Sequence, residues 1–473
     1  MQRNSQVVLL LMFLLTATLT KAQTNPRYKL PGYQKFQLQN GLTVYLMEKH
    51  DVPIMSIDVV VPAGAIYDGE KAGLASLTAT CLKCGTKSYT KKQIEEAFDF
   101  AGASYDISGS KEFAEVTVEL AVKDQDKLLP VIKELLVDPT FPEAEVTKEK
   151  KRELVNLNQS KESPEQVIDL YWDKFFFGKA AYGNIVSGTA SSLTPLTSAS
   201  LKTFYASRYS PSGSAIAVVG DFNVDEMKAT ITKLFSGWKG SAEAGSATAS
   251  LSFDPPATKR VLLVNKDDAK ETTLLIGGTG VSRNNPDYLP IEVINTFFGG
   301  RFTSWLNDEL RIKSGLTYGA RSTFTTFKTS GVFLISTHTA NETTEPTIDK
   351  TLETLNRLHD QPLDEQTLTS AKNYMIGLFP PRFQTTEQLA RLLTNMFWYG
   401  YDESYINNFE TNVNAVTMEK ANAIIEKYFS KDNLQFVLIG KASEIKKIAD
   451  KYGPVTEVQI KDDIGKGFEH PRL

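Results

Sequence analysis

The sequence has few of the residues that bind transition metals through nitrogen or sulfur. Its 473 residues include only four histidines and two cysteines. The histidines are scattered, with no pair three or four residues apart, so no helix can present two of them on one face. They are His50, His338, His359 and His470. The spacing predicts histidines at the surface or packed in the core, not a histidine-based metal site.

The two cysteines, Cys81 and Cys84, stand three residues apart near the end of a predicted helix. A close pair in an exported protein is a candidate for a disulfide or for redox chemistry. Two thiols on one helix more often pack or stay reduced. We therefore expect packed thiols, and the sequence leaves their redox state open.

The sequence has no excess of charge of either sign. Its 52 basic and 56 acidic residues give a net charge of 52 − 56 = −4. We therefore expect no strongly basic surface that would bind nucleic acid or an anionic membrane.

Long apolar runs are also lacking, with one exception at the start of the chain. Arg3 precedes an apolar run at 7–15, and Thr20-Lys21-Ala22 offers small residues at the −3 and −1 positions of a cut after Ala22. This pattern predicts a secretory signal peptide at 1–22, with a retained anchor as the alternative. We expect an exported mature protein, periplasmic or extracellular, with no membrane span once the signal is removed.

The remaining sequence has the composition of a folded globular protein, with 41% hydrophobic and 23% charged residues. The chain is too long for one hydrophobic core. Small, polar and turn-forming residues collect at 239–258, as in a linker. We expect one domain at 23–238, this linker, and a second domain at 259–473.

The ends of the two domains resemble each other. Tyr209 precedes a short apolar strand that ends at Gly220, and Tyr428 precedes one that ends at Gly440. The separations are 220 − 209 = 11 and 440 − 428 = 12, and a helical pattern follows each strand. A fixed order of elements at nearly fixed spacing indicates an internal duplication.

Within the first domain, β-rich runs at 43–47 and 54–61 and an alternating run at 114–122 predict strands. Helices are predicted at 74–84, 91–101, 124–137 and 143–159. Because strands and helices are grouped and do not strictly alternate, the fold class is α+β. We expect two homologous domains, each with a largely antiparallel sheet packed with helices.

One segment carries a recognisable motif. The run from Gly73 to Thr86, Gly-Leu-Ala-Ser-Leu-Thr-Ala-Thr-Cys-Leu-Lys-Cys-Gly-Thr, resembles the signature of the pitrilysin/insulinase family of zinc peptidases, the inverzincins. In that family Gly-Leu-Ala precedes His-x-x-Glu-His, and Gly-Thr follows a few residues later. The flanking residues match here, and the resemblance covers about 33–458.

The residues between the matching flanks do not fit zinc. In the family two histidines one turn apart bind the metal, and the glutamate activates its water. In register, the histidine positions hold Ser76 and Thr80, and the glutamate position holds Ala79. The family's third ligand is a glutamate about 76 residues past the second histidine, and 80 + 76 = 156 is Asn156. The resemblance thus implies that the chain binds no zinc and does not hydrolyse peptides alone.

Other acidic residues do not rebuild such a site. Asp68 and Glu70, in the turn before the motif, could form at most a weak oxygen site for a metal.

A second motif of the family is intact. The run Leu310-Arg311-Ile312-Lys313-Ser314-Gly315-Leu316-Thr317-Tyr318 resembles its C-terminal signature, in which an arginine and a tyrosine seven apart bind the substrate backbone and polarise the scissile carbonyl. Here 318 − 311 = 7. By resemblance, Arg311 and Tyr318 are candidate substrate-binding residues. The structural alternative is that Arg311 caps a helix that ends at Gly315 and that Tyr318 is a strand aromatic.

Some members of this family are heterodimers in which one subunit holds the zinc and its partner has lost the metal motif. The resemblance implies that this chain is such a partner. It is then the non-catalytic, substrate-binding subunit of an exported heterodimeric peptidase that acts on peptides or unfolded segments. The expected partner is a homologous subunit with an intact motif, which carries the zinc.

Two alternatives remain open at this stage. The first is a peptidase-derived structural or scaffold protein with no proteolytic role, comparable to the family's core subunits in a respiratory complex. The second is a lone peptidase with an atypical metal site.

Overall fold

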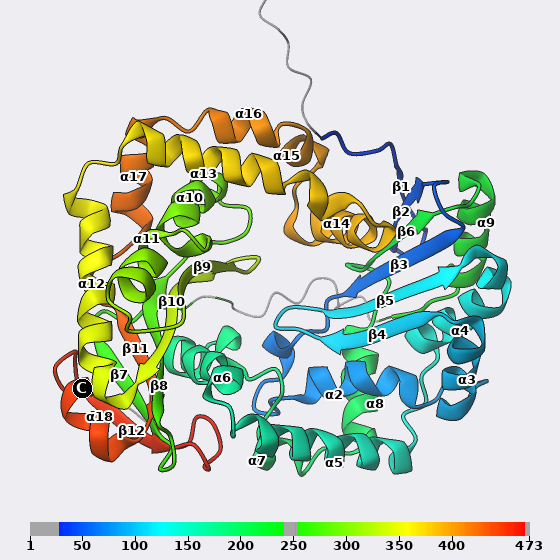
Figure 1. Cartoon of the computed structure of the whole chain (residues 1–473). Helices are drawn as coiled ribbons and strands as arrows, with labels where there is room; N and C mark the ends of the chain where they lie inside the picture. Colours follow the sequence, from blue (N-terminus) through cyan, green and yellow to red (C-terminus); the bar gives the residue numbers. More distant parts are fainter. Residues whose placement is uncertain (1–27, 241–250, 252, 469–473) are drawn as a thin grey trace, which may run out of the picture.

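A computed structural model describes residues 28–240, 251 and 253–468. It contains two six-stranded sheets, one in each half of the chain, on opposite sides of the molecule (Figure 1). The strands of the first sheet are β1 Gln34–Gln37, β2 Thr43–Glu48, β3 Ile54–Val61, β4 Ser104–Gly109, β5 Ala114–Ala121 and β6 Ala215–Gly220. Those of the second are β7 Arg260–Asn265, β8 Glu271–Thr279, β9 Ala320–Thr326, β10 Gly331–Ala340, β11 Gln435–Gly440 and β12 Val455–Gln459.

The two sheets have the same topology. The order β2-β6-β3-β5-β4 in the first corresponds strand for strand to β7-β11-β8-β10-β9 in the second. Each has one extra edge strand, β1 beside β2 and β12 beside β7. Pairing is largely antiparallel, and the parallel pairs are β2 with β6 and β7 with both β11 and β12. The predicted duplicated α+β fold is confirmed.

The local sequence accounts for the elements of the first half. In β5 buried and half-buried residues alternate along the strand, as its apolar–polar pattern predicts. Thr90 begins α3 (Lys91–Ala101) with a capping box to Gln93, and Gly102 ends it with a positive φ. The predicted helix at 74–84 begins at Leu74 as expected. It is α-helical only in α2 (Leu74–Thr80) and tightens into the 3-10 turn η2 (Cys81–Cys84), where both cysteines are buried and free.

Most helices cover the sheet of their own half. In the first half these include α4 Gln125–Val137, α8 Ser198–Arg208 and α9 Val224–Phe235, with α5 Glu143–Ser160 and the short α7 Ala190–Leu193 alongside. In the second half they include α10 Tyr288–Asn295, α12 Thr344–Asp360, α13 Glu365–Leu378, α17 Met418–Tyr428 and α18 Ala442–Ala449, with the short α15 Glu403–Asn407 and α16 Phe409–Asn414.

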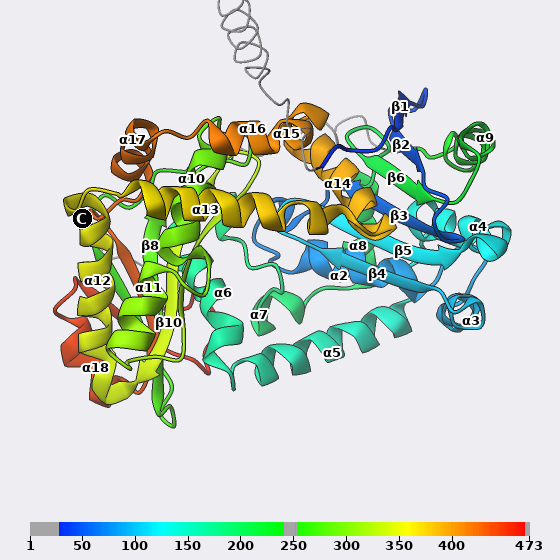
Figure 2. The ribbon, with the colours of Figure 1, turned by 45° about the horizontal axis from the view of Figure 1, so that its top comes forward.

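Two helices cross to the opposite half. The helix α14 (Thr386–Tyr399), from the second half, packs on β3 and β6 of the first sheet. The helix α6 (Pro164–Phe177), from the first half, packs on β8 and β11 of the second sheet. Figures 1 and 2 show both crossings, gold for α14 and teal for α6. On each sheet, helices of its own half cover one face, and a helix of the other half covers part of the opposite face.

Apolar side chains make these crossings. The α14 side chains of Leu389, Leu393 and Met396 share a core with Met47 and Val219 of the first sheet. The α6 aromatics share a core with the second sheet, and those facing it include Trp172, Phe175 and Phe176 beside Leu262, Leu275 and Val437. Since burial of one large apolar side chain stabilises by roughly 1.5–3 kcal/mol, the crossings join the halves firmly.

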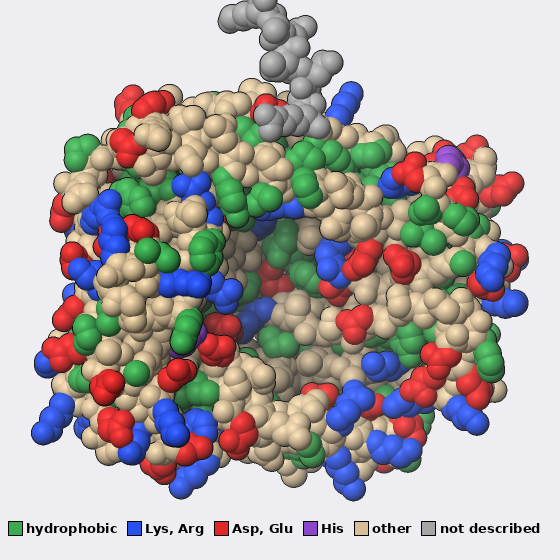
Figure 3. All heavy atoms as spheres, viewed as in Figure 1, with side chains coloured by type: hydrophobic (Ala, Val, Ile, Leu, Met, Phe, Trp, Pro, Cys, Tyr) green, Lys and Arg blue, Asp and Glu red, His purple; other side chains and the backbone are tan. Residues whose placement is uncertain are grey.

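The molecule is hollowed between the two halves (Figure 3). Acidic, basic and apolar side chains all appear on the walls of the hollow in that view. None of the helices in the described residues has the length and hydrophobicity required to cross a bilayer. The predicted signal peptide at 1–22 and most of the predicted linker lie outside the described residues.

Candidate functional site

The motif helix α2 is held at its start by a buried carboxylate. The N–H groups of Gly73 and Ala75 donate to the two Asp68 oxygens at 2.8 and 2.7 Å, and Gly73 takes the positive φ of 88° that leads into the helix. Burial raises the pKa of Asp68 to about 8, while the two amide hydrogen bonds lower it. Both oxygens thus cap α2, so the expectation that Asp68 and Glu70 could form a weak oxygen site for a metal is not supported.

The helix packs closely on the edge strand β4. A Cβ added at Gly109 would lie 2.7 Å from the Ser76 Cα, so this strand position needs glycine. On α2, Ala79 is fully buried, and Ser76 and Thr80 are half-buried. The framework of the motif is therefore folded, while its three chemical positions carry one methyl group and two hydroxyl groups.

The third ligand position is equally unsuited to a metal. Asn156 lies exposed on α5, and a neutral amide is a poor substitute for a carboxylate. The buried carboxylate on the same helix, Glu149, is already paired with Lys91 at 2.7 Å and with Arg152. Nowhere in the part of the chain that the structure describes do three histidine, cysteine, aspartate or glutamate side chains gather as a metal would need. The residues present do not fit zinc.

The motif of the second half lies on a π-helical segment. Arg311 lies in η6 (Asp308–Lys313), a π-helical segment that follows the one-turn helix α11 (Trp305–Asn307). The helix ends at Lys313, and Gly315 continues with a φ of +62°. A second π-helical segment, η5 (Thr296–Gly300), extends α10, and its Gly299 approaches β9 so closely that a Cβ would meet Ser322 N at 2.4 Å. Such π turns are frequent at functional sites.

Neighbouring ion pairs leave Arg311 available. Lys313 is bound to Asp308 at 2.8 Å and to Glu309 at 2.9 Å. The Arg311 guanidinium lies over the exposed Phe302 ring, 4.8 Å from its centroid. No carboxylate of the described residues lies within ion-pair distance of Arg311. Its five N–H groups can therefore donate hydrogen bonds to a ligand.

Tyr318 is exposed. It lies two residues before β9, and 81% of its surface is accessible. Tyr318 thus lies outside the strand, whereas the alternative expected a strand aromatic. A tyrosine with this exposure can offer its hydroxyl to a ligand.

Arg311 and Tyr318 line one cavity of about 640 Å³. Its other charged lining residues include Arg301, Arg321 and His338 of the second half and Glu165 and Asp169 of α6. His338 Nδ1 lies 3.2 Å from Glu165 Oε1, which joins β10 to the crossing helix. Partial desolvation raises the pKa of Asp169, and Arg321 opposes that shift. The structure thus brings the two predicted residues together and adds charged side chains from both halves.

The sequence does not indicate that these additional residues form a site with Arg311 and Tyr318. Glu165 lies in the first turn of α6, but nothing in the sequence indicates that it faces a strand more than 170 residues away. The four motif positions on α2 and α5 lie on other walls of the molecule and do not line this cavity.

Comparison with known proteins identifies the fold. The family model described as "Insulinase (Peptidase family M16)" matches residues 43–190, and the one described as "Peptidase M16 inactive domain" matches 195–375. The chain belongs to the insulinase family. It is a non-catalytic member, because all four catalytic and ligand positions are substituted.

Curated relatives span nearly the whole described fold. A Bacillus subtilis protein named "Uncharacterized zinc protease YmxG" is 24% identical, over 84% of this chain and 96% of its own length. A Helicobacter pylori protein named "Non-peptidase homolog YmxG" is 21% identical, over 86% of this chain and 94% of its own length.

Solved structures share the fold. A structure titled as a peptidase M16 inactive domain from Pseudomonas fluorescens has a TM-score of 0.79 at 24% identity, and covers 87% of this chain and 98% of the other. A structure titled as a protease from Helicobacter pylori has a TM-score of 0.80 at 18% identity, and covers 87% and 100%.

Proposed function

We propose that this protein is the substrate-binding, non-catalytic subunit of an exported heterodimeric zinc peptidase that acts on peptides or unfolded segments. One observation carries the proposal. The family's metal positions are lost at Ser76, Ala79, Thr80 and Asn156, while Arg311 and Tyr318 remain together in an open cavity. A site shared between two chains divides its residues in this way.

The cavity has the chemistry of a peptide clamp. Arg311 supplies charged donors and Tyr318 a neutral hydroxyl donor, both suited to a backbone carbonyl whose oxygen gains negative charge. A hollow lies between the halves (Figure 3), and we expect it to receive an extended chain more readily than a folded domain. Bond cleavage is left to a homologous partner with an intact metal motif, and the zinc belongs to that partner.

The test compares peptide hydrolysis by the mature chain, by the partner, and by their mixture, with zinc present throughout. We expect activity in the mixture and none from this chain alone. Tyr318→Phe and Arg311→Ala are each expected to lower kcat of the mixture by about 10²–10³-fold, the usual loss of one donor to an oxyanion. Asn156→Ala is the control and should leave the mixture unchanged, since that exposed amide has no role in the proposed site.

Other results would contradict the proposal in distinct ways. Chelator-sensitive hydrolysis by this chain alone would reveal a metal site of its own. If the mixture were as active with Arg311→Ala and Tyr318→Phe as with the wild-type chain, the proposed substrate-binding role of these two residues would be wrong. If neither the chain nor the mixture hydrolysed peptides, the scaffold function would replace this one.

A further inference from the structure

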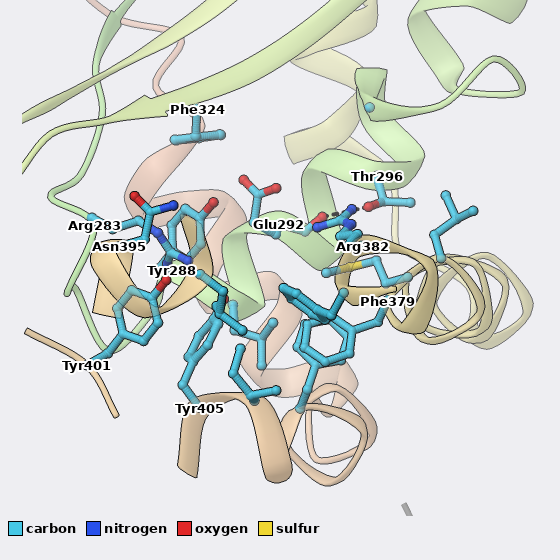
Figure 4. A pocket seen from close by; sticks show the side chains of 18 of the residues that line it. Arg283, Tyr288, Glu292, Thr296, Phe324, Phe379, Arg382, Asn395, Tyr401 and Tyr405 are labelled. Carbon is cyan, nitrogen blue, oxygen red and sulfur yellow. Dashed lines mark hydrogen bonds between the residues drawn. The ribbon is translucent and has the colours of Figure 1, made fainter. Parts of the chain in front are cut away.

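A second and larger cavity, of about 860 Å³, lies in the second half beside the one just described. It is enclosed by α10, the end of α13, η8 (Pro380–Phe383), the start of α14 and α15 (Figure 4). Gly300 and Tyr374 line both cavities, so the two are neighbours on one continuous surface. A ligand held at Arg311 and Tyr318 can therefore extend into this space.

The cavity carries an excess of positive charge. Its charged lining residues are three arginines and two glutamates, which gives 3 − 2 = +1. Two of them, Arg391 and Glu387, pair with each other at 3.5 Å. Arg283, Arg382 and Glu292 remain to meet a ligand, and this balance favours an anion.

Arg283 is held in place by aromatic rings. Its guanidinium lies 4.1 Å from the ring centroid of Tyr288 and 5.1 Å from those of Tyr401 and Tyr405. Burial raises the pKa of Tyr401 to about 12, so its hydroxyl stays a neutral donor. This cage fixes a positive charge in the wall without neutralising it.

Arg382 and Glu292 point toward the same space (Figure 4). Arg382 is exposed, and within 28–240, 251 and 253–468 no carboxylate lies within ion-pair distance of it. The Glu292 carboxyl likewise has no hydrogen bond or ion pair among those residues. A bidentate arginine is the usual partner of a carboxylate ligand.

Glu292 can adapt to such a ligand. Burial raises its pKa to about 7, against the opposing charges of Arg283 and Arg382. The groups facing it from the neighbouring elements are these two arginines and the tyrosine cage, and Arg391 and Glu387 of α14 also line the cavity. The lysines Lys420 and Lys427 of α17 are bound to Asp287. When protonated, Glu292 can donate a hydrogen bond to a ligand carboxylate.

The remaining wall is apolar. It is formed by side chains that include Leu289, Leu378, Phe379, Phe383, Leu392 and Ile406. A ligand that combines a carboxylate with an adjacent apolar side chain uses both parts of the cavity.

We propose that this cavity binds the free C-terminus of a peptide with an apolar last residue, whose carboxylate meets Arg382 while upstream residues reach Arg311 and Tyr318. This assignment rests on the proposed substrate-binding function. It adds a substrate class, namely short peptides with a free C-terminal carboxylate. An acidic side chain within a longer peptide offers the same carboxylate, so the experiment must separate the two sources.

The test measures binding of fluorescent, unstructured 12-residue peptides to the mature chain at pH 6 by anisotropy. One peptide ends in a free leucine carboxylate, the second in leucine amide, and the third in the same amide with one internal aspartate. We expect the free acid to bind at least 10-fold more tightly than either amide. Arg382→Gln should abolish that difference, and Arg208→Gln, an arginine stacked on Tyr67 in the first half, should preserve it.

The pH profile supplies a second readout. Ionisation of Glu292 above pH 7 places a negative charge beside the ligand carboxylate, so the preference for the acid should fall between pH 6 and pH 8. Glu292→Gln cannot ionise and should keep the same preference at both pH values. A merely structural role of Glu292 would not flatten the profile.

The outcomes distinguish this assignment from the proposed function. Equal binding of acid and amide, weakened in both by Arg311→Ala, would overturn the cavity assignment and leave the proposed function standing. Binding of the internal-aspartate amide as tight as that of the free acid would overturn the preference for a C-terminus. No binding of any peptide would overturn both.

Discussion

Asp58 places a carboxyl group in the contact between β3 and the crossing helix α14. Only 2% of the residue is exposed, and neither oxygen has a hydrogen-bond partner among the described residues. The nearest cation is Arg391, whose Nε lies 3.8 Å from Asp58 Oδ2 and 3.3 Å from Glu115 Oε1. Burial and the neighbouring Glu115 raise the pKa of Asp58 well above its usual value, and Arg391 only partly opposes them.

This shift predicts a stability that falls as pH rises. Between the ordinary aspartate range near pH 4 and the raised native pKa, the unfolded chain loses the Asp58 proton while the native state keeps it. The native state then binds more protons, so the free energy of unfolding decreases through that window. Asp58→Asn should stabilise the protein at pH 7, because the amide is neutral at every pH and, unlike the carboxyl, takes up no proton on burial.

The measurement is the melting temperature from pH 4 to pH 8 for both proteins. The gap between variant and wild type should widen with pH. Asp106→Asn, on exposed Asp106 of β4 in the same sheet, is the matched control and should show no such trend. A variant that melts below the wild type at pH 7 would mean that ionised Asp58 is needed to hold Arg391.

At the scale of single residues, the sequence was most informative about the zinc-site residues that the chain lacks. Ser76, Ala79, Thr80 and Asn156 could be identified because the flanking residues fix their register, and side-chain chemistry alone excludes them as zinc ligands. The sequence allowed Asp68 at most a weak oxygen site for a metal, because spacing alone does not show that two helix N–H groups already occupy its oxygens.

At the scale of elements, α14 contributes both to the contact between the halves and to the second cavity. It covers the first sheet, and its first turns supply Gln388 and Arg391 to the second cavity. Its start is fixed by a capping box, in which Gln388 N donates to Thr385 Oγ1 at 3.1 Å and Thr385 N donates to Gln388 Oε1 at 3.1 Å. The Ser56 hydroxyl on β3 shares a 2.7 Å hydrogen bond with Thr386.

Loss of this cap should loosen the contact between the halves. Thr385→Ala removes the side-chain acceptor and is expected to cost about 1 kcal/mol. Hydrogen exchange should then speed up along the first turns of α14 and in the β3 segment beneath it. Thr90→Ala removes the equivalent box of α3, and its faster exchange should stay within α3. Unchanged exchange in β3 with Thr385→Ala would show that the apolar contacts alone hold the helix.

The elements themselves were largely predictable, whereas their crossings were not. The strands at 54–61 and 114–122 and the helices at 91–101 and 143–159 follow from periodicity and capping residues, and the structure places them within a residue or two. Periodicity reports which face of α6 is apolar, but not which sheet buries it. For that reason Glu165, Asp169 and His338 could not be predicted as neighbours of Arg311.

At the scale of the whole molecule, the duplicated sheets and the two crossing helices make each half depend on the other. The repeated strand order shows that each half has the elements of a complete domain. Yet each sheet has one face that only the other half covers, with α14 on the first and α6 on the second. A half alone would expose a broad apolar sheet face, which in a soluble protein leads to association.

We therefore predict that the halves are stable only together. Residues 28–240 and 251–468, produced separately, should each aggregate or bind hydrophobic dye strongly, because the exposed sheet face and the unpartnered crossing helix are both apolar. Produced in the same cell, they should co-purify as a 1:1 complex that melts in a single transition, since the two crossings bury both faces at once. Size-exclusion chromatography and calorimetry would distinguish these states. If either half were instead monomeric with its own cooperative melting transition, the crossings would be a docking contact between independent domains, and the hollow between them could open without unfolding either half.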